Sequence, residues 1–250
     1  MEKNMDSKLV NMLEQCVHRG ASDLHISPDS CPYFRLHGEL LSVDKDIISA
    51  GQVEQIILSL LNPEQREVVK QCKSIDIAFS FQNVERFRAN IYMERRGLSI
   101  AIRKLDNEFR SFHQLGLPNS IGGLADLRDG LVLLTGPTGS GKTTTLATLI
   151  NRINAHRSCH ILTIEDPIEY VHQNAKSLVH QRELNTDVGS FAEAVRASLR
   201  EDPDVVLIGE MRDLDTMRTA ITVAETGHLV FSTLHCGNAV GALDRLIGAF

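Results

Sequence analysis

Apolar and polar residues follow two different patterns over residues 1–108, which predicts a small domain that mixes helices and strands. Three segments have apolar residues at helical spacing, and each begins after a polar residue that can cap a helix, at Asp6 or Ser7, at Ser49 and at Asn62. The stretch Ile75–Phe81 alternates between apolar and polar residues, as a strand with one buried face does. We therefore expect residues 1–108 to form an α+β domain.

The segment Val84–Lys104 predicts two neighbouring strands with an apolar face and an arginine-bearing face. The apolar face would hold Phe87, Ala89, Ile91 and Met93, continued after a turn by Leu98, Ile100 and Ile102. The opposite face would carry Arg86, Arg88, Asn90 and Arg103. This second face is either an ordinary solvated surface or one whose arginines meet phosphate across a domain or subunit boundary.

The pattern changes after residue 108. Residues 109–120 lose strand periodicity and end in turn-forming residues, which predicts a linker. Over residues 121–250, helical patterns alternate with short apolar runs, at Leu131–Thr135, His160–Ile164, Val205–Ile208 and Leu229–Phe231. Short apolar strands between helices, the first of which we expect to be fully buried, are typical of a parallel sheet in an α/β domain. Ligands of such sheets bind at the carboxyl ends of the strands.

One loop in this second region has the chemistry to bind polyphosphate. Gly136–Thr143 reads GPTGSGKT, matches the phosphate-loop pattern, and lies between the first apolar run and a helical pattern. Backbone amides at a junction of strand, loop and helix point toward one place and bind anions there. The alternative is a Gly-rich turn that only resembles the motif, but such a turn would not explain the strand and helix on either side. Lys142 would reach the β- and γ-phosphates of a nucleoside triphosphate, and the Thr143 hydroxyl would hold Mg²⁺. The expected nucleotide contacts are Gly136, Pro137, Thr138, Gly139, Ser140, Gly141, Lys142, Thr143 and Thr144.

Acidic residues directly follow two of the apolar runs. Glu210 is the best candidate to orient the attacking water, although Gly209 stands where the second nucleotide-binding motif often has Asp. Glu165 and Asp166 are candidates for contact with metal or water, and Glu169 is a further one. The alternative for these acids is a structural role at the start of a loop. The expected Mg²⁺ ligands, in part through water, are Thr143, Asp166 and Glu210.

Two histidines, His228 and His235, bracket the last apolar run. An isolated histidine is most often a packed or capping residue. His235, however, follows a strand at the edge where the ligand would bind. For His235 a functional role is therefore as well supported as a packed or capping one. It could sense the γ-phosphate or transmit its loss to the next element.

Composition narrows the classes of function. The chain has 250 residues, a net charge of −6 and 5 cysteines, which lie far apart. The acidic balance disfavours general nucleic-acid binding, and the cysteine spacing disfavours a zinc site or a disulfide framework. No apolar run is long enough for a membrane-spanning helix, and Met1–Val10 lacks the apolar core of a signal peptide, so we expect a cytoplasmic protein.

Four blocks in fixed order resemble the motifs of the bacterial secretion ATPases. They are GPTGSGKT as the phosphate loop, ILTIEDPIEYVH as the Asp box, REDPDVVLIGEMRD as the Walker B motif and ETGHLVFSTLH as the His box. Within that superfamily the blocks are most similar to the PilT-like type IV pilus retraction ATPases. The segments GASDLHI and ERFRANIY near the N-terminus resemble the same family.

The resemblance implies a homohexameric motor that hydrolyses ATP with Mg²⁺. Each subunit would have a PAS-like N-terminal domain and a RecA-like phosphate-loop ATPase domain, which hydrolysis rotates against an inner-membrane platform protein to power pilus retraction. The ring would work at the cytoplasmic face of the inner membrane and would bind no nucleic acid. The implied catalytic residues are Glu210, Lys142, Glu165, His235, Arg88 and Arg103, with Arg96 as a further candidate.

Two departures from the family leave alternatives open. The family continues beyond the position of Phe250 as a helical C-terminal region, so the sequence is either a fragment or that of a protein without this region. Cys236 and Gly248 also replace a usual threonine and a usual acid. The alternatives are an ATPase of a type II or type IV secretion, conjugation or pilus-assembly system, a RecA-like DNA helicase or recombinase, and a regulatory binder of ATP. The absence of a tetracysteine motif favours retraction over assembly.

Overall fold

The computed structural model describes residues 5–82, 85–105 and 108–248, so that Val84 and Phe250 lie outside the described residues. The chain divides into two compact units, Met1–Asn107 and Glu108–Phe250. Part of the segment expected as a linker packs into the second unit. Phe112 packs into the core of that unit, and the carbonyl of Arg110 accepts a hydrogen bond of 3.1 Å from the Thr148 hydroxyl.

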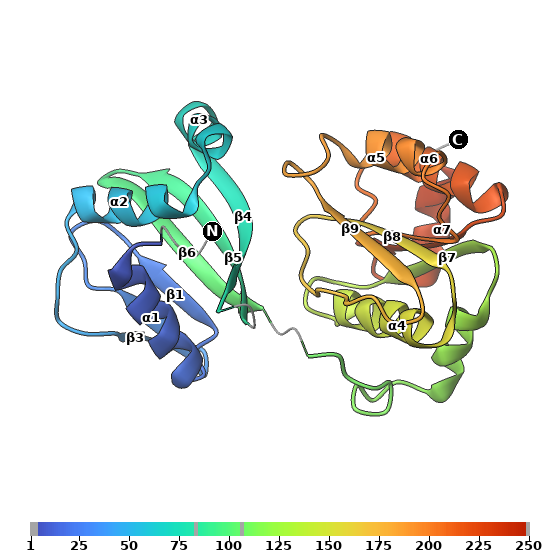
Figure 1. Cartoon of the computed structure of the whole chain (residues 1–250), viewed down its shortest axis with the longest axis horizontal. Coiled ribbons are helices and arrows are strands. Elements are labelled where there is room, and N and C mark those ends of the chain that lie inside the picture. Colours follow the sequence, from blue (N-terminus) through green and yellow to red (C-terminus); the bar gives the residue numbers. More distant parts are fainter. Residues whose placement is uncertain (1–4, 83–84, 106–107, 249–250) are drawn as a thin grey trace. The chain divides into compact units, whose positions relative to one another are not determined.

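The first unit is a six-stranded antiparallel sheet with three helices. In chain order its elements are α1 (Ser7–His18), β1 (Asp23–Ile26), β2 (Tyr33–Leu36), β3 (Glu39–Ser42), α2 (Ala50–Leu60), α3 (Pro63–Cys72), β4 (Ser74–Phe81), β5 (Glu85–Glu94) and β6 (Gly97–Leu105). The sheet order is β3-β2-β1-β6-β5-β4 (Figure 1). The helices begin where the capping residues predicted. The Asp6 carboxylate accepts from two backbone amides of α1, and Asn62 caps α3.

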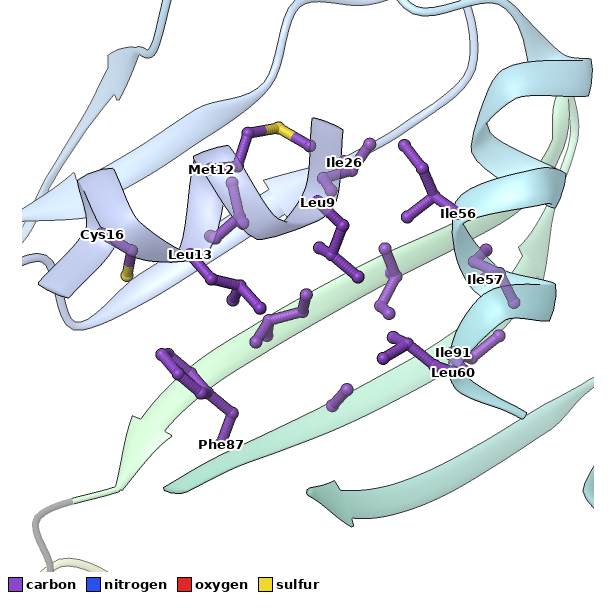
Figure 2. Packing of buried hydrophobic residues seen from close by; sticks show 14 of the residues in the cluster. Leu9, Met12, Leu13, Cys16, Ile26, Ile56, Ile57, Leu60, Phe87 and Ile91 are labelled. Carbon is purple, nitrogen blue, oxygen red and sulfur yellow. The ribbon is translucent and has the colours of Figure 1, made fainter. Parts of the chain in front are cut away.

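One face of this sheet carries the core of the first unit. Figure 2 shows Leu9 and Leu13 of α1, Ile57 of α2, and Phe87 and Ile91 of β5 in one cluster, and each of these five side chains is fully buried. Because side chains alternate along a strand, the even-numbered residues of β5 are left on the opposite face. The predicted apolar face is confirmed except at Met93, which is 45% exposed near the end of β5.

The second unit is a five-stranded sheet in which every pairing is parallel. Its strands are β7 (Gly130–Thr135), β8 (His160–Glu165), β9 (Leu178–Glu183), β10 (Val205–Ile208) and β11 (Leu229–Leu234), in the order β7-β11-β10-β8-β9. Its helices are α4 (Lys142–His156), α5 (Phe191–Ser198), α6 (Leu214–Glu225), α7 (Ala239–Ile247) and a 3₁₀ helix, η2 (Asn119–Asp126).

Helices cover both faces of the parallel sheet, as the alternating pattern predicted (Figure 1). Val205 and Leu207 of β10 pack with α4 and η2, whereas Val206 and Ile208 pack with α5 and α6. The four apolar runs are all strands, but two details differ from expectation. The first run is only half-buried because β7 is an edge strand, and β9, the strand at the other edge, has too few apolar residues to stand out in the sequence.

Candidate nucleotide site

The phosphate loop connects the end of β7 to the start of α4, where the sequence placed it. Gly136 has a φ of 152°, a backbone conformation that residues with a side chain rarely adopt, and a Cβ there would lie 2.7 Å from the Ser140 hydroxyl, which would have to move. Gly141, with a φ of 86°, is the N-cap of α4, which begins at Lys142. The unpaired amides of the first turn of α4 and the positive end of its dipole are therefore available to an anion. This backbone fits a polyphosphate.

The side chain of Lys142 folds back onto the phosphate loop. Its Nζ donates hydrogen bonds to the carbonyls of Gly136 at 3.0 Å and Pro137 at 2.9 Å. Thr143 is exposed in the first turn of α4, and the hydroxyl of Thr144 accepts a hydrogen bond of 3.2 Å from the Tyr170 hydroxyl. The loop thus presents the Lys142 ammonium group and the exposed residue Thr143 where the sequence predicted contacts with phosphate and metal.

Three acidic or histidine side chains follow neighbouring strands at the same edge of the sheet. The strands are parallel, so Glu165 at the end of β8, Glu210 after β10 and His235 after β11 share the edge at which β7 enters the phosphate loop. Backbone hydrogen bonds tie these strand ends together: Gly209 donates to Ile164 at 2.8 Å, and Met211 donates to Thr233 at 3.2 Å. The predicted grouping is therefore present in the second unit.

Gly209 has a structural reason to lack a side chain. A Cβ at this position would lie 3.4 Å from both the Cα of Glu165 and the carbonyl oxygen of Ile164. The end of β10 passes close to the backbone at the end of β8, and glycine permits this approach. Glu165 and Glu210 are therefore at or directly after two strand ends whose backbones lie close together.

Glu210 lies between two basic side chains. Its Oε1 is 2.6 Å from Nη2 of Arg212, and its Oε2 is 3.5 Å from Nε2 of His235. The Glu210 side chain is 12% exposed, whereas that of Arg212 is 71% exposed. The hydrogen bond that Arg212 donates to Glu210 raises the pKa of Arg212. Sequence reasoning missed Arg212, although its position two residues after the predicted catalytic glutamate was a usable signal.

Glu165 is a buried carboxyl group with neutral hydrogen-bond donors. Its Oε1 accepts from the Thr163 hydroxyl at 2.7 Å and from Nε2 of Gln181 at 3.2 Å. Burial raises the pKa of Glu165 to about 7, and the nearby carboxylates of Glu169 and Glu183 act in the same direction. The group is therefore poised to change charge near neutral pH, a property that is frequent at functional sites.

The residues predicted to hold Mg²⁺ carry the oxygen donors that this ion prefers. Asp166 directly follows Glu165, is half-buried, and is joined to Pro167 by a cis peptide bond. Among residues 5–82, 85–105 and 108–248, no group of three or more His, Cys, Asp or Glu side chains could hold a metal ion by itself. Mg²⁺ commonly takes one or two carboxylates together with phosphate oxygens and waters, so Thr143, Asp166 and Glu210 are a suitable donor set.

Two predicted residues of the first unit are held by acids of their own sheet. Arg88 of β5 and Arg103 of β6 are directly opposite each other in the strand register. Both Nε and Nη2 of Arg88 are 3.3 Å from Oδ1 of Asp76, and Nε of Arg103 is 2.8 Å from Oδ1 of Asp23. The arginine-bearing face is confirmed, and the guanidinium groups of Arg88 and Arg103 on it are ion-paired.

The second histidine flanking β11 has a structural role. Nδ1 of His228 is 3.1 Å from the hydroxyl of Thr226 and 3.0 Å from the carbonyl of Val223, both near the end of α6. This is the capping contact that the sequence left open as the ordinary explanation. His235, in contrast, is beside Glu210, as described above.

The fold and the loop define a phosphate-loop nucleotide-binding protein, with the polyphosphate cradle at the carboxyl edge of a parallel sheet. The chain belongs to the type II/IV secretion system protein family, whose model matches residues 2–248. No helix in the part of the chain that the structure describes is long and apolar enough to cross a membrane.

The chain is similar to two named proteins and to one solved structure. The type IV pilus retraction ATPase PilT of Pseudomonas aeruginosa is 42% identical over 97% of this chain and 70% of its own length. The twitching motility protein of Neisseria gonorrhoeae is 46% identical over 88% of this chain, which spans 59% of that protein. The crystal structure of the pilus retraction motor PilT with bound ADP is 42% identical, has a TM-score of 0.92, and is matched over 96% of this chain and 71% of its own.

Proposed function

We propose that this protein is an ATPase of a hexameric motor that powers type IV pilus retraction. The observation that carries the proposal is the shared edge of the parallel sheet, where the phosphate loop, Glu165, Glu210 and His235 follow four of its strands. A cradle alone would serve any phosphate-binding protein, whereas a cradle with strand-end carboxylates suits hydrolysis. The relatives named as a retraction ATPase and a twitching motility protein support the biological role.

Residues of the second unit would have distinct roles in ATP hydrolysis. The loop Gly136–Thr144 and Lys142 would hold the phosphates, and Glu210 would orient the attacking water. Thr143, Asp166 and Glu210 would hold Mg²⁺, which neutralises charge on the phosphate oxygens when it is bound. Glu165 would contribute a further acid, and His235, 3.5 Å from Glu210, would report whether the γ-phosphate is present.

The finer description of the domains belongs to the same proposal. Residues 1–108 would be a PAS-like domain, 109–120 a linker and 121–250 a RecA-like ATPase domain. Arg88 and Arg103 would contribute positive charge to the nucleotide, from the same subunit or from a neighbouring one. The motor would be a homohexamer on the cytoplasmic face of the inner membrane, acting on a platform protein there.

The first test is nucleotide binding by Lys142→Ala. The change removes the ammonium group at the mouth of the phosphate loop, so we expect fluorescent ADP and ATP analogues to bind at least about a hundredfold more weakly. Lys176→Ala, at an exposed position of the same unit, is the matched control and should bind like the wild type. Wild-type hydrolysis by Lys142→Ala would refute the assignment of the loop.

The second test is the number of surface pili on cells that lack the gene. An excess of pili that no longer shorten would establish retraction. Bald cells would make the protein an assembly motor instead, and an unchanged number of pili would favour secretion or conjugation.

A further inference from the structure

The carboxyl group of Glu165 is oriented by two donors that reach the same oxygen. Thr163 and Glu165 are two residues apart on β8, so their side chains are on the same face of the strand. Gln181 is directly opposite Thr163 in the parallel pairing of β8 and β9, and its amide reaches the same face. Because both hydrogen bonds end on Oε1, they also fix the direction in which Oε2 points.

Gln181 makes two further hydrogen bonds, both to the segment that follows Glu165. Its Nε2 donates to the carbonyl of Tyr170 at 2.8 Å, and its Oε1 accepts from the backbone amide of His172 at 2.7 Å. One amide group thus uses both of its donors and its acceptor. No other side chain of similar size offers two donors and one acceptor in this arrangement.

Tyr170 extends this network to the phosphate-loop helix. Its side chain is buried, and its hydroxyl donates to the hydroxyl of Thr144 at 3.2 Å. A second residue of β9, Glu183, accepts from the amide of Ile168 at 3.1 Å. The segment between Glu165 and His172 is therefore attached to β9 at separate points, and its Tyr170 side chain reaches α4.

We propose that Gln181 is a positioning residue for ATP hydrolysis, which fixes the carboxyl group of Glu165 and links it through Tyr170 to the phosphate-loop helix. The inference rests on the proposed function, because Glu165 has a catalytic task only if the site hydrolyses ATP. A carboxyl group that must contact water or metal in the transition state needs a fixed orientation, and buried neutral donors provide it. Gln181 itself would touch neither nucleotide nor metal.

The test compares the steady-state kinetics of ATP hydrolysis by the wild type and by Gln181→Met, each as the full-length assembled protein. The change keeps the side-chain length and removes every hydrogen bond of the amide. We expect kcat to fall about tenfold to a hundredfold while KM for ATP stays within about threefold, because phosphate binding does not use Gln181. Gln173→Met makes the same exchange at an exposed nearby position and should keep wild-type kinetics.

A double-mutant cycle separates positioning from a merely structural role. If Gln181 acts through Glu165, the pair Gln181→Met and Glu165→Gln should lose no more kcat than Glu165→Gln alone. A structural role would give losses that multiply. Tyr170→Phe keeps the ring and removes the hydrogen bond to Thr144, so we expect a smaller fall in kcat, about threefold to tenfold.

Gln181→Asn keeps the experiment decisive if Gln181→Met does not fold. It keeps an uncharged amide in the buried position, but the side chain is one methylene shorter and withdraws its donor from Glu165, so we expect a folded protein with a similarly reduced kcat. Multiplicative losses, or wild-type kcat in a folded Gln181→Asn protein, would overturn the inference and leave the proposed function intact. A wild-type protein that neither binds nor hydrolyses ATP would overturn both.

Discussion

Two buried carboxyl groups, one in each unit, show how differently this protein treats an acid. Asp23 of β1 and Glu165 of β8 are both only 7% exposed. Burial alone would raise the pKa of Asp23, but the hydrogen bond and charge of Arg103, with a hydrogen bond from Ser22, hold it below its ordinary value. Glu165 has only neutral donors in Thr163 and Gln181, and burial raises its pKa to about 7.

The difference teaches that the partner, and not the depth of burial, decides whether a buried acid stabilises the fold. The Asp23–Arg103 pair links β1 to β6 and supports the sheet of the first unit. Glu165 costs stability whenever it is ionised, because its hydrogen-bond donors among the described residues, Thr163 and Gln181, are neutral. Such a cost is typical of a group kept for chemistry. The following changes test this comparison.

Glu165→Gln should have the largest effect on stability, and the effect should be favourable. A carboxyl group whose pKa is raised on folding makes the free energy of unfolding fall as the pH rises from about 4.5 through about 7. This shift of the Glu165 pKa on folding corresponds to about 3 kcal/mol in the free energy of unfolding. Glu165→Gln should be more stable than the wild type by this amount at about pH 8, and equally stable at about pH 4.5.

The free energy of unfolding is measured by urea titration, monitored by circular dichroism, without nucleotide and with a chelator. Glu225→Gln, an exposed glutamate on α6, is the matched control and should follow the wild-type pH profile. If Glu165→Gln were less stable than the wild type at about pH 8, the ionised carboxyl group of Glu165 would have to be stabilised by a positively charged partner, and the comparison with Asp23 would fail.

Asp23→Asn should have a smaller effect of opposite sign. The change removes the charge that Arg103 pairs with at 2.8 Å, so we expect the free energy of unfolding to fall by about 1–2 kcal/mol at neutral pH. Since the pKa of Asp23 is lowered on folding, this difference should shrink as acid protonates the wild-type carboxylate. Urea unfolding measures it, with Glu39→Gln at an exposed position of β3 as the control. Equal stability at neutral pH would contradict a stabilising pair.

Gly209→Ala should have the smallest effect of the three. The added methyl group would lie 3.4 Å from the backbone of Glu165 and Ile164, which must move slightly to accommodate it. We expect a loss of about 1 kcal/mol in the free energy of unfolding. Gly123→Ala places its methyl group in open space and is the matched control. A stabilised Gly209→Ala protein would show that the two strand ends are less closely packed than described.

The sequence was sufficient for the features that depend on local patterns. The capping residues located the helices of the first unit, the alternating residues of β5 and β6 identified both faces, and consecutive apolar residues identified four of the five parallel strands. The phosphate loop followed from its own motif. The order of the strands in the sheet was not predictable from these signals, because it depends on contacts between distant segments.

The features that the sequence did not reveal depend on where an element lies in the sheet. β7 is half-buried despite its four consecutive apolar residues because it is an edge strand, and the polar sequence of β9 concealed a strand. Gln181 lies on β9 and is far in sequence from Glu165, so no spacing rule connects them. The ion pair of Glu210 with Arg212 likewise becomes visible only when side chains are placed.

ATP hydrolysis at the carboxyl edge of the parallel sheet depends, in this proposal, on Glu210 as the residue that orients water. Glu210→Gln tests it when ATP binding and hydrolysis are measured beside the wild type. We expect wild-type affinity for ATP within a few fold and a turnover rate lower by about a hundredfold or more. Turnover at the wild-type rate would contradict it and would move the catalytic role to Glu165, Asp166 or Glu169.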